Sequence, residues 1–227
     1  MHVWRADLSP GRARLLELWQ SLSADERERA RRFHFERDRG SFIAARGALR
    51  NILSRYTGTA PGLLRFSYDA YGKPALSEAV AGRLRFNVSH SHGLALYAVT
   101  AGREVGIDLE FVREDFASLE VAERFFSPQE VSALRSLQPE ERANAFFDCW
   151  TRKEAYIKAR GEGLSHPLHL FTVSLKPGEP AALLSTEDDP RETARWSLRE
   201  LSAGEGYRAA IAVEGTPPSL SCWRWDF

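Results

Sequence analysis

The residues with the clearest capacity for chemistry are three carboxylates, Asp108, Glu110 and Glu154. Asp108 and Glu110 occupy alternate positions of the β-rich segment Val105–Phe111, so their side chains would share one face of a strand. Two like charges this close repel each other unless a cation lies between them. The alternative is a strand that leaves its sheet with both carboxylates in water.

Glu154 favours a bound cation, because it falls on the apolar stripe of a predicted helix. The members of that stripe are Ala143, Phe146, Phe147, Trp150 and Ile157. A buried carboxylate is costly unless it is paired or ligates a metal. An i,i+4 salt bridge to Lys158 is the alternative, but it leaves the stripe position unexplained. Three carboxylates suit a hard cation such as Mg²⁺, which completes its shell with waters and substrate phosphate.

Lysine is rare in this chain, and three of its four lysines lie either close to these carboxylates in the sequence or in a predicted turn. Arginine supplies 27 of the 31 basic residues, and lysine occurs only at Lys73, Lys153, Lys158 and Lys176. A compact ammonium and a planar guanidinium are not interchangeable at a bound phosphate. Lys153 and Lys158 flank Glu154, so we expect them to serve the same phosphate; chance retention is the alternative.

The segment Asn87–Gly93 is rich in serine and histidine and ends a predicted strand. Ser89 and His90 are disfavoured as nucleophile and base, because neighbours on a strand point to opposite faces. His90 and His92 share a face, but no third soft metal ligand is near in the sequence. We favour hydrogen bonding from this segment to phosphate oxygens. No Walker A or dinucleotide-binding glycine motif is present.

Charge and composition exclude several classes of protein. The 31 Lys and Arg residues balance 31 Asp and Glu residues, so the chain lacks the basic field of a protein that coats nucleic acid. Cys149 and Cys222 form no zinc or disulfide pattern, which suits a reducing compartment. No apolar run approaches about 20 residues. We therefore expect a cytoplasmic protein that binds neither nucleic acid nor membrane.

Helices and strands follow one another in mixed order along the chain, which predicts an α+β fold. The charged segment Asp25–Arg39 and the segment Phe42–Tyr56 predict a helix. Strands are predicted over Leu84–Val88, Leu94–Thr100 and Val105–Phe111, the last two joined by a connection of hairpin length, Ala101–Glu104.

The second part of the chain carries strong helix boundaries. Ser127, Pro128 and Glu130 predict a helix start with a capping box. Pro139 opens a helix that ends near Arg160, before Gly161. The tail predicts strands and turns, with these core candidates: Trp196, Tyr207, Ile211, Trp223 and Trp225.

A faint internal repeat indicates two similar halves. Ser41–Gly47 aligns with Ala155–Gly161 at an offset of 114, with four identities in seven. We predict an N-terminal α+β half over 1–104 and a C-terminal α+β half over 105–227 that carries the metal ligands. A single active site would then lie in the cleft between them.

Five segments together resemble the Sfp-type 4′-phosphopantetheinyl transferase family. They read GKPAL (72–76), FNVSHS (86–91), VGIDLE (105–110), RFFSPQE (124–130) and WTRKEAYIKARGEGL (150–164). The combination of GIDLE with the long last segment is highly specific, and the resemblance covers most of the chain except the tail. It implies a pseudo-twofold duplication of two α+β halves, with coenzyme A and Mg²⁺ (or Mn²⁺) in the cleft.

The resemblance also implies roles for individual residues. It assigns the metal to Asp108, Glu110 and Glu154. Around coenzyme A it places Arg29, Arg32, Arg46, Lys73, Ser89, His90, Lys153 and Lys158. The family commonly has lysine in its 3′-phosphate pocket, where this chain offers arginines. In catalysis it implies Glu154, Lys158, His90 and Glu130. Glu130 could help to deprotonate the acceptor, but a capping-box role explains it equally well.

The implied reaction transfers 4′-phosphopantetheine from coenzyme A to a serine of an apo acyl or peptidyl carrier protein and releases adenosine 3′,5′-bisphosphate. Such carriers serve fatty-acid, polyketide and nonribosomal-peptide biosynthesis. We expect the carrier to contact an apolar patch that consists of Phe116, Leu119, Val121 and Phe125. Two alternatives stay open: an Mg²⁺-dependent nucleotide or coenzyme A phosphohydrolase, and a non-catalytic module that binds coenzyme A or a carrier. We expect a monomer, because the doubled chain builds its own interface.

Overall fold

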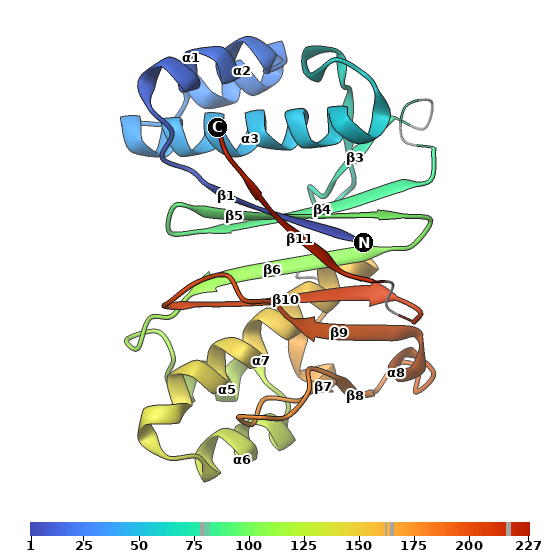
Figure 1. The fold of residues 1–227 in the computed structure, drawn as a ribbon. Helices are drawn as coiled ribbons and strands as arrows, with labels where there is room; N and C mark the ends of the chain where they lie inside the picture. The colour runs from blue at the N-terminus through green and yellow to red at the C-terminus, as the bar shows by residue number, and fades with distance from the viewer. Residues whose placement is uncertain (78–79, 81, 162, 164–165, 217–218) are drawn as a thin grey trace.

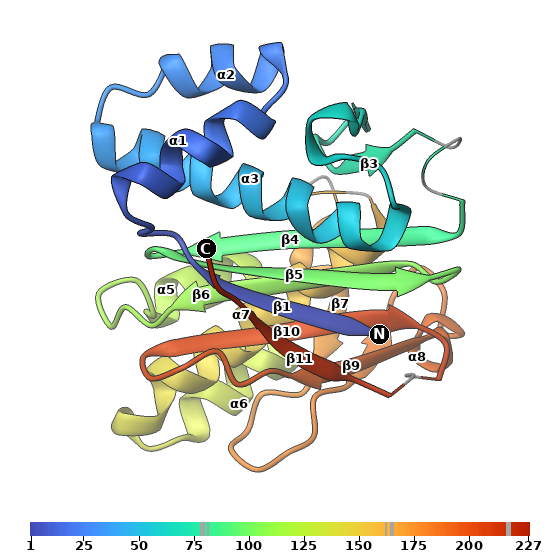
Figure 2. The same ribbon diagram turned by 45° about the horizontal axis from the view of Figure 1, so that its top comes forward.

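The computed structural model describes residues 1–77, 80, 82–161, 163, 166–216 and 219–227, and in it two β-sheets lie between two groups of helices (Figures 1 and 2). The first half contains β1 (His2–Asp7), α1 (Arg12–Ser21), α2 (Ala24–Arg31), α3 (Glu36–Thr57), η1 (Pro61–Leu63), β2 (Phe66–Tyr68), β3 (Pro74–Leu76), β4 (Leu84–Ser91) and β5 (Leu94–Ala101). The second contains β6 (Val105–Phe111), α5 (Leu119–Phe125), α6 (Pro128–Ser136), α7 (Pro139–Arg160), η3 (Leu168–Leu170), β7 (Phe171–Val173), β8 (Leu183–Thr186), α8 (Glu192–Arg195), β9 (Trp196–Glu200), β10 (Tyr207–Glu214) and β11 (Ser221–Trp225).

The two main sheets have strand orders β11-β1-β5-β4 and β6-β10-β9. β5 is antiparallel to both β1 and β4, and β10 is antiparallel to both β6 and β9. β11 pairs in parallel with β1, so the last strand returns to the sheet of the first half (Figure 1). The C-terminal segment thus connects the two halves, and the predicted domain bounds of 1–104 and 105–227 stay a prediction.

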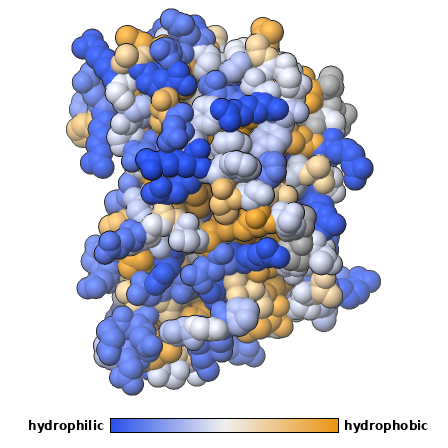
Figure 3. Space-filling model, in the orientation of Figure 1, coloured by the Kyte–Doolittle hydropathy of each residue, from blue (hydrophilic) through white to orange (hydrophobic). Residues whose placement is uncertain are grey.

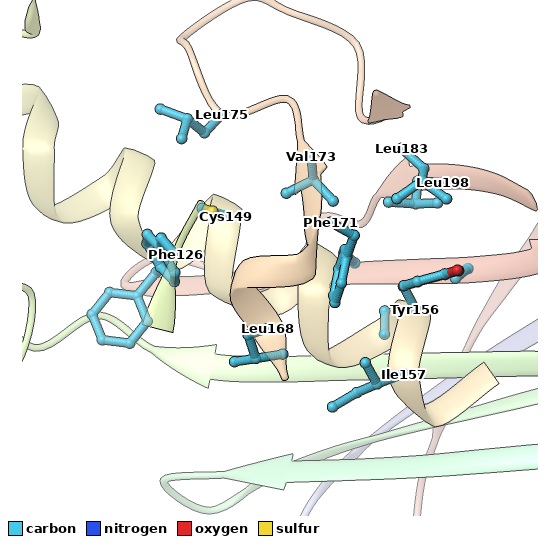
Figure 4. Packing of buried hydrophobic residues seen from close by; sticks show 14 of the residues in the cluster. Phe126, Cys149, Tyr156, Ile157, Leu168, Phe171, Val173, Leu175, Leu183 and Leu198 are labelled. Atoms are coloured by element: carbon cyan, nitrogen blue, oxygen red, sulfur yellow. The ribbon is translucent and has the colours of Figure 1, made fainter. Parts of the chain in front are cut away.

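Three apolar layers hold the sheets and helices together. Ile52 of α3 packs in the layer between that helix and the first sheet. Leu96 of β5 and Ile107 of β6 belong to the layer between the two sheets. Tyr156 of α7 and Phe171 of β7 lie in the layer under the second helix group (Figure 4). Burial of apolar surface in these layers is the main force that holds the halves together.

The same ion pair recurs in both halves. In the first, Glu26 accepts a hydrogen bond from the Ser23 N–H at the start of α2, and Arg50 of α3 lies 2.6 Å from its carboxylate. In the second, Glu130 accepts from the Ser127 N–H at the start of α6, and Lys153 Nζ of α7 lies 2.8 Å from its carboxylate. Each cation also donates to backbone carbonyls in and beside the following 3₁₀ helix: Pro61, Leu64, Leu168 and Phe171.

This recurrence fixes the register of the duplication and corrects the predicted offset of 114. Arg50 and Lys153 are 103 positions apart, as are Gly58 and Gly161, the left-handed glycines that end the two 22-residue helices. Gly47, which the sequence aligned with Gly161, lies in the middle of α3 against Leu18. The mixed helix and sheet class and the two-half organisation are confirmed, but the predicted alignment was a chance match.

Several predicted elements differ from the structure. The charged segment does not form one helix with its successor, because the chain turns between α2 and α3, where Phe33 packs on Phe42. β5 and β6 form no hairpin, because β1 and β4 occupy both edges of β5. Trp223 was predicted in the core but is 50% exposed.

The predicted helix boundaries of the second half are confirmed. Ser127 caps α6 with Glu130 closing the box, and α7 runs from Pro139 to Arg160 with Gly161 in the left-handed conformation. Within the described ranges, no helix is long and apolar enough to cross a membrane. On the surface, hydrophobic residues gather near the middle of the face in Figure 3, over the strands where the two halves meet.

Candidate active site

The outer face of β6 presents two carboxylates to α7. Val105, Ile107 and Leu109 face the first sheet, so strand alternation turns Asp108 and Glu110 the other way. Gly106 allows α7 to pass very close, since a Cβ there would lie 2.0 Å from the Ala155 carbonyl oxygen. This close crossing places side chains of α7 directly over Asp108.

Lys158 of α7 forms the closest of these contacts. Its Nζ lies 2.5 Å from Asp108 Oδ1 and 3.3 Å from Ser89 Oγ of β4. The Ser89 hydroxyl donates to the same Asp108 oxygen over 2.9 Å. The other oxygen, Asp108 Oδ2, is buried and has no hydrogen-bond partner among the residues that the structure describes. A buried carboxylate oxygen without a donor is costly, which makes this atom a natural ligand for a cation.

The pKa values of the neighbouring carboxyl groups are raised. Burial raises the pKa of Glu154 to about 7, and the charges of Asp108 and Glu110 add to this effect. The pKa of Glu110 is raised by burial and by Asp108. Burial alone would lower the pKa of Lys158, but Asp108 and the two glutamates outweigh it, so that pKa is raised. The cluster therefore carries an excess of negative charge that a divalent cation would relieve.

The carboxylates of Asp108, Glu110 and Glu154 are the kind of ligand that a hard divalent cation binds, although they are not arranged around a common point. In the part of the chain that the structure describes, no group of three or more His, Cys, Asp or Glu side chains is placed to hold a metal ion. Carboxylate oxygens are nevertheless the ligands that Mg²⁺ prefers, and Asp108 Oδ2 lacks any other partner within the described ranges.

A pocket of about 510 Å³ opens beside the cluster, between the two halves. Glu154 and Lys158 line one side, and the turn Tyr71–Pro74 between β2 and β3 lines the other. Both views show this hairpin beside the C-terminal end of α3 (Figures 1 and 2). A pocket that joins cations, carboxylates and an aromatic ring has the composition expected for a nucleotide-containing substrate.

Lys73 connects the two walls of this pocket. Its Nζ donates to the Lys158 carbonyl oxygen over 2.7 Å and lies 3.6 Å from Glu104. Burial lowers the pKa of Lys73, and Glu104 partly offsets that effect. Lys73 therefore caps the C-terminal end of α7 as well as facing the pocket.

His90 lies on the face of β4 opposite to Ser89. Although much of His90 remains exposed, the surrounding protein displaces enough water to lower its pKa, and the charges of Lys158 and Arg29 lower it further. Arg29 and Arg32 line an open pocket of about 530 Å³ on α2. Arg29 and Lys158 thus both place positive charge close enough to His90 to affect its protonation.

Three residues predicted at the site make their contacts within one half of the molecule. Lys153 and Glu130 are 0% and 1% exposed and pair with each other inside the second half. Lys153 precedes Glu154 by one position, so it points about 100° away around the helix. Arg46 contacts Glu26 over 2.6 Å and also donates to Tyr68, so its guanidinium is engaged by the first half.

The sequence interpretation missed the structural use of Asn87 and Ser91. The strand was predicted to end at Val88, but β4 continues to Ser91. Asn87, Ser89 and Ser91 alternate along it and face β6, to which they bond. Polar residues at every second position were the available signal for such a face.

The predicted carrier surface is only partly accessible. Phe116 packs against Phe146, Phe147 and Trp150, and Phe125 packs against Trp150. Leu119 and Val121 are half-buried beside the same cluster. In the motif 150–164, Glu162 and Leu164 lie outside the described residues.

Comparison with family models matches two consecutive parts of the chain. The model described as "4′-phosphopantetheinyl transferase, N-terminal" matches residues 6–104. The model of the 4′-phosphopantetheinyl transferase superfamily matches residues 104–212. Together they include β4, β6 and α7, the three elements that build the acidic cluster.

Curated relatives are similar over most of the chain. The 4′-phosphopantetheinyl transferase HetI of Nostoc sp. is 43% identical over 226 residues, which cover 99% of this chain and 92% of the relative. Sfp of Bacillus subtilis is 35% identical over 193 residues, or 85% of this chain and 82% of the relative. The human L-aminoadipate-semialdehyde dehydrogenase-phosphopantetheinyl transferase is 27% identical over 220 residues, or 90% and 71% of the two chains.

Proposed function

The chain belongs to the 4′-phosphopantetheinyl transferase superfamily, and from this premise we propose that its acidic cluster holds a divalent cation beside the pyrophosphate of coenzyme A. The protein transfers the 4′-phosphopantetheine group of coenzyme A to a carrier protein. We also propose roles for individual residues, and adenosine 3′,5′-bisphosphate as the second product.

Asp108, Glu110 and Glu154 would hold the ion. The observation that carries this assignment is Asp108 Oδ2, a buried oxygen without a partner in the described part of the chain, beside two carboxyl groups with raised pKa values. When bound, such an ion offsets negative charge on the attacked and leaving phosphoryl groups. Mg²⁺ is the metal we propose, and Mn²⁺ can replace it at oxygen ligands.

Lys158 would bind a phosphate oxygen of coenzyme A. An ammonium group has three N–H donors. Within the described residues, two of those on Lys158 donate to Asp108 Oδ1 and Ser89 Oγ. The third could donate to a phosphate at the edge of the pocket, where a fixed positive charge stabilises developing negative charge. Lys73 lies at the other wall, where the nucleotide would enter.

For the 3′-phosphate we propose Arg29, Arg32 and His90. Arg29 and Arg32 share one pocket, and Arg29 is close enough to His90 to influence its pKa. Arg46 of α3 pairs with Glu26 of α2, so its role would be to hold these two helices together beside the phosphate.

Glu154 is the carboxylate we propose as proton acceptor. It lines the pocket that the carrier serine would enter, whereas Glu130 is enclosed. In the proposed step the carrier serine oxygen attacks the β-phosphorus of coenzyme A and gives its proton to a Glu154 carboxylate oxygen. The bond to the bridging pyrophosphate oxygen breaks, and adenosine 3′,5′-bisphosphate leaves with the bonding electrons.

The test combines the protein with coenzyme A, MgCl₂ and a panel of apo carriers, and measures the pantetheinyl mass gain. We expect the mass gain to disappear in EDTA and to fall about 10³-fold in rate for Asp108→Asn. Full turnover in EDTA would contradict the metal role. Bisphosphate release that does not depend on a carrier would indicate that hydrolysis competes with transfer.

A further inference from the structure

The two halves are joined beside the acidic cluster by side chains instead of a backbone ladder. β4 and β6 are edge strands of different sheets. The Ile107 N–H donates to Asn87 Oδ1 over 2.9 Å, the Leu109 N–H to Ser89 Oγ over 3.3 Å, and the Phe111 N–H to Ser91 Oγ over 3.2 Å. Each acceptor precedes its donor by 20 residues, so β4 and β6 run in the same direction with a constant offset. We call this row of three side-chain hydrogen bonds the seam.

The two serines of the seam also hold the carboxylates of β6. Ser89 Oγ donates to Asp108 Oδ1 over 2.9 Å, and Ser91 Oγ donates to Glu110 Oε2 over 3.0 Å. The relation is the same in both cases. Each serine accepts from the backbone of one β6 residue and donates to the carboxylate of the residue before it.

These bonds leave the Ser89 hydroxyl little freedom. A hydroxyl has one donor and two acceptor sites. Ser89 uses all three, because its oxygen accepts from both Leu109 N–H and Lys158 Nζ while its proton goes to Asp108. A phosphate oxygen would have to displace Asp108 to receive that proton, which argues against direct binding of coenzyme A by Ser89.

We propose that Ser89 and Ser91 are positioning residues for Asp108 and Glu110, so that the metal site is assembled by contact between the two halves. The first half supplies the hydroxyls and the second half supplies the carboxylates. Hydrogen bonds of this kind orient metal-binding carboxylates, and their loss commonly weakens metal binding about 10- to 100-fold. The inference rests on the proposed metal role of Asp108 and Glu110.

Asn87 provides a matched control within the same seam. It accepts from the β6 backbone as the serines do, but it has no hydrogen bond to a carboxylate in the described part of the chain. Loss of its side-chain acceptor therefore tests the joint between the halves without removing a carboxylate contact. Ser91 is the better test position, because it is half-buried while Ser89 is buried.

The experiment measures Mn²⁺ binding to the whole protein by electron paramagnetic resonance, without coenzyme A, together with thermal unfolding. We expect Ser91→Ala to weaken Mn²⁺ about 10-fold or more and Ser91→Thr, which keeps the hydroxyl, to restore most of the affinity. Asn87→Ala should lower the unfolding temperature but bind Mn²⁺ like the wild type. In a Glu110→Gln background, Ser91→Ala should have no further effect on Mn²⁺.

The outcomes separate this inference from the proposed function. Loss of Mn²⁺ in Asp108→Asn with unchanged binding in Ser91→Ala would overturn the positioning role and keep the metal site. Unchanged Mn²⁺ binding in Asp108→Asn would overturn the metal site itself. Equal loss of Mn²⁺ in Asn87→Ala and Ser91→Ala would show that only the joint matters, which also overturns the positioning role. If Ser91→Ala does not fold, the Ser91→Thr and Ser91→Cys pair gives the same comparison, and equal affinity in both would contradict the proposal.

Discussion

Glu154 is a carboxyl group whose protonation is controlled by its surroundings. Its pKa of about 7 in the folded protein exceeds the ordinary value of 4.5, because burial and the charges of Asp108 and Glu110 disfavour the carboxylate. A folded pKa above the unfolded one means that the folded state binds more protons between these values. Stability of the metal-free protein should therefore fall as pH rises from about 4.5 to 7 and level off above.

The first prediction concerns this fall in stability with rising pH. Glu154→Gln should remove most of this pH dependence and raise the unfolding free energy near pH 8 by up to about 3 kcal/mol in EDTA, while activity is lost. Urea unfolding at pH 5, 6, 7 and 8 measures it, with the exposed Glu179→Gln as control. Parallel pH profiles for wild type and Glu154→Gln would contradict the raised pKa.

Lys158 provides the second prediction at the residue scale. Lys158→Ala should raise KM for coenzyme A and lower kcat, because it removes the cation nearest to Asp108. Lys158→Arg should not fully restore either value, since a planar guanidinium cannot replace a compact ammonium in this space. Pantetheine incorporation into an apo carrier gives both constants. The exposed Lys176→Ala should match the wild type, and equal activity of Lys158→Arg and wild type would refute the geometric argument.

Local sequence patterns predicted only part of this arrangement. Strand alternation correctly placed Asp108 and Glu110 on one face, and helix periodicity turned Glu154 and Lys158 toward the same side. Lys153 was placed with Glu154 because the two are adjacent in the sequence. Adjacent residues on a helix point about 100° apart, so Lys153 faces a different direction from Glu154. The contacts of Ser89 and Ser91 depend on the proximity of β4 and β6, which are joined through β5 and share no local pattern.

At the scale of elements, the recurring ion pairs anchor the long helices. Glu26–Arg50 and Glu130–Lys153 each connect a capping box to a 22-residue helix, and the first pair lies in the half without the carboxylate cluster. A feature present in both halves is explained by the shared fold. We therefore assign Glu130 and Lys153 a structural role in holding α7, which in turn presents Glu154 to the pocket.

The third prediction tests this assignment. Lys153→Met should cost about 3–5 kcal/mol of unfolding free energy, because it leaves the buried Glu130 without its cation. Arg50→Met should cost less, because Glu26 keeps its ion pair with Arg46. Adding Glu130→Gln to Lys153→Met should restore much of the loss. KM for coenzyme A should stay unchanged in the folded fraction of each variant. A raised KM for Lys153→Met without loss of stability would show instead that Lys153 contacts coenzyme A.

At the scale of the whole molecule, the last strand joins the halves in a way that the sequence did not predict. β11 follows the second half in sequence but lies beside β1 in the first sheet. Its two tryptophans differ in environment: Trp225 is 6% exposed, whereas Trp223 is 50% exposed and stacks on Trp4. Both were predicted in the core, and they lie two positions apart on one face of β11, but the sequence gave no information on how far α3 extends over that face.

The fourth prediction uses these two residues as a matched pair. Trp225→Ala should cost about 3–5 kcal/mol, because it removes a large side chain from the layer between α3 and the first sheet. Trp223→Ala should cost about 1 kcal/mol, mostly from its stacking on Trp4. Urea unfolding measures both losses, and size-exclusion chromatography of the same samples tests the expected monomer. Because β11 closes the first sheet far from the carboxylates of β6, KM for coenzyme A should be unchanged in both variants. Equal losses for the two tryptophans would mean that β11 is held by its backbone pairing with β1 and not by the burial of Trp225.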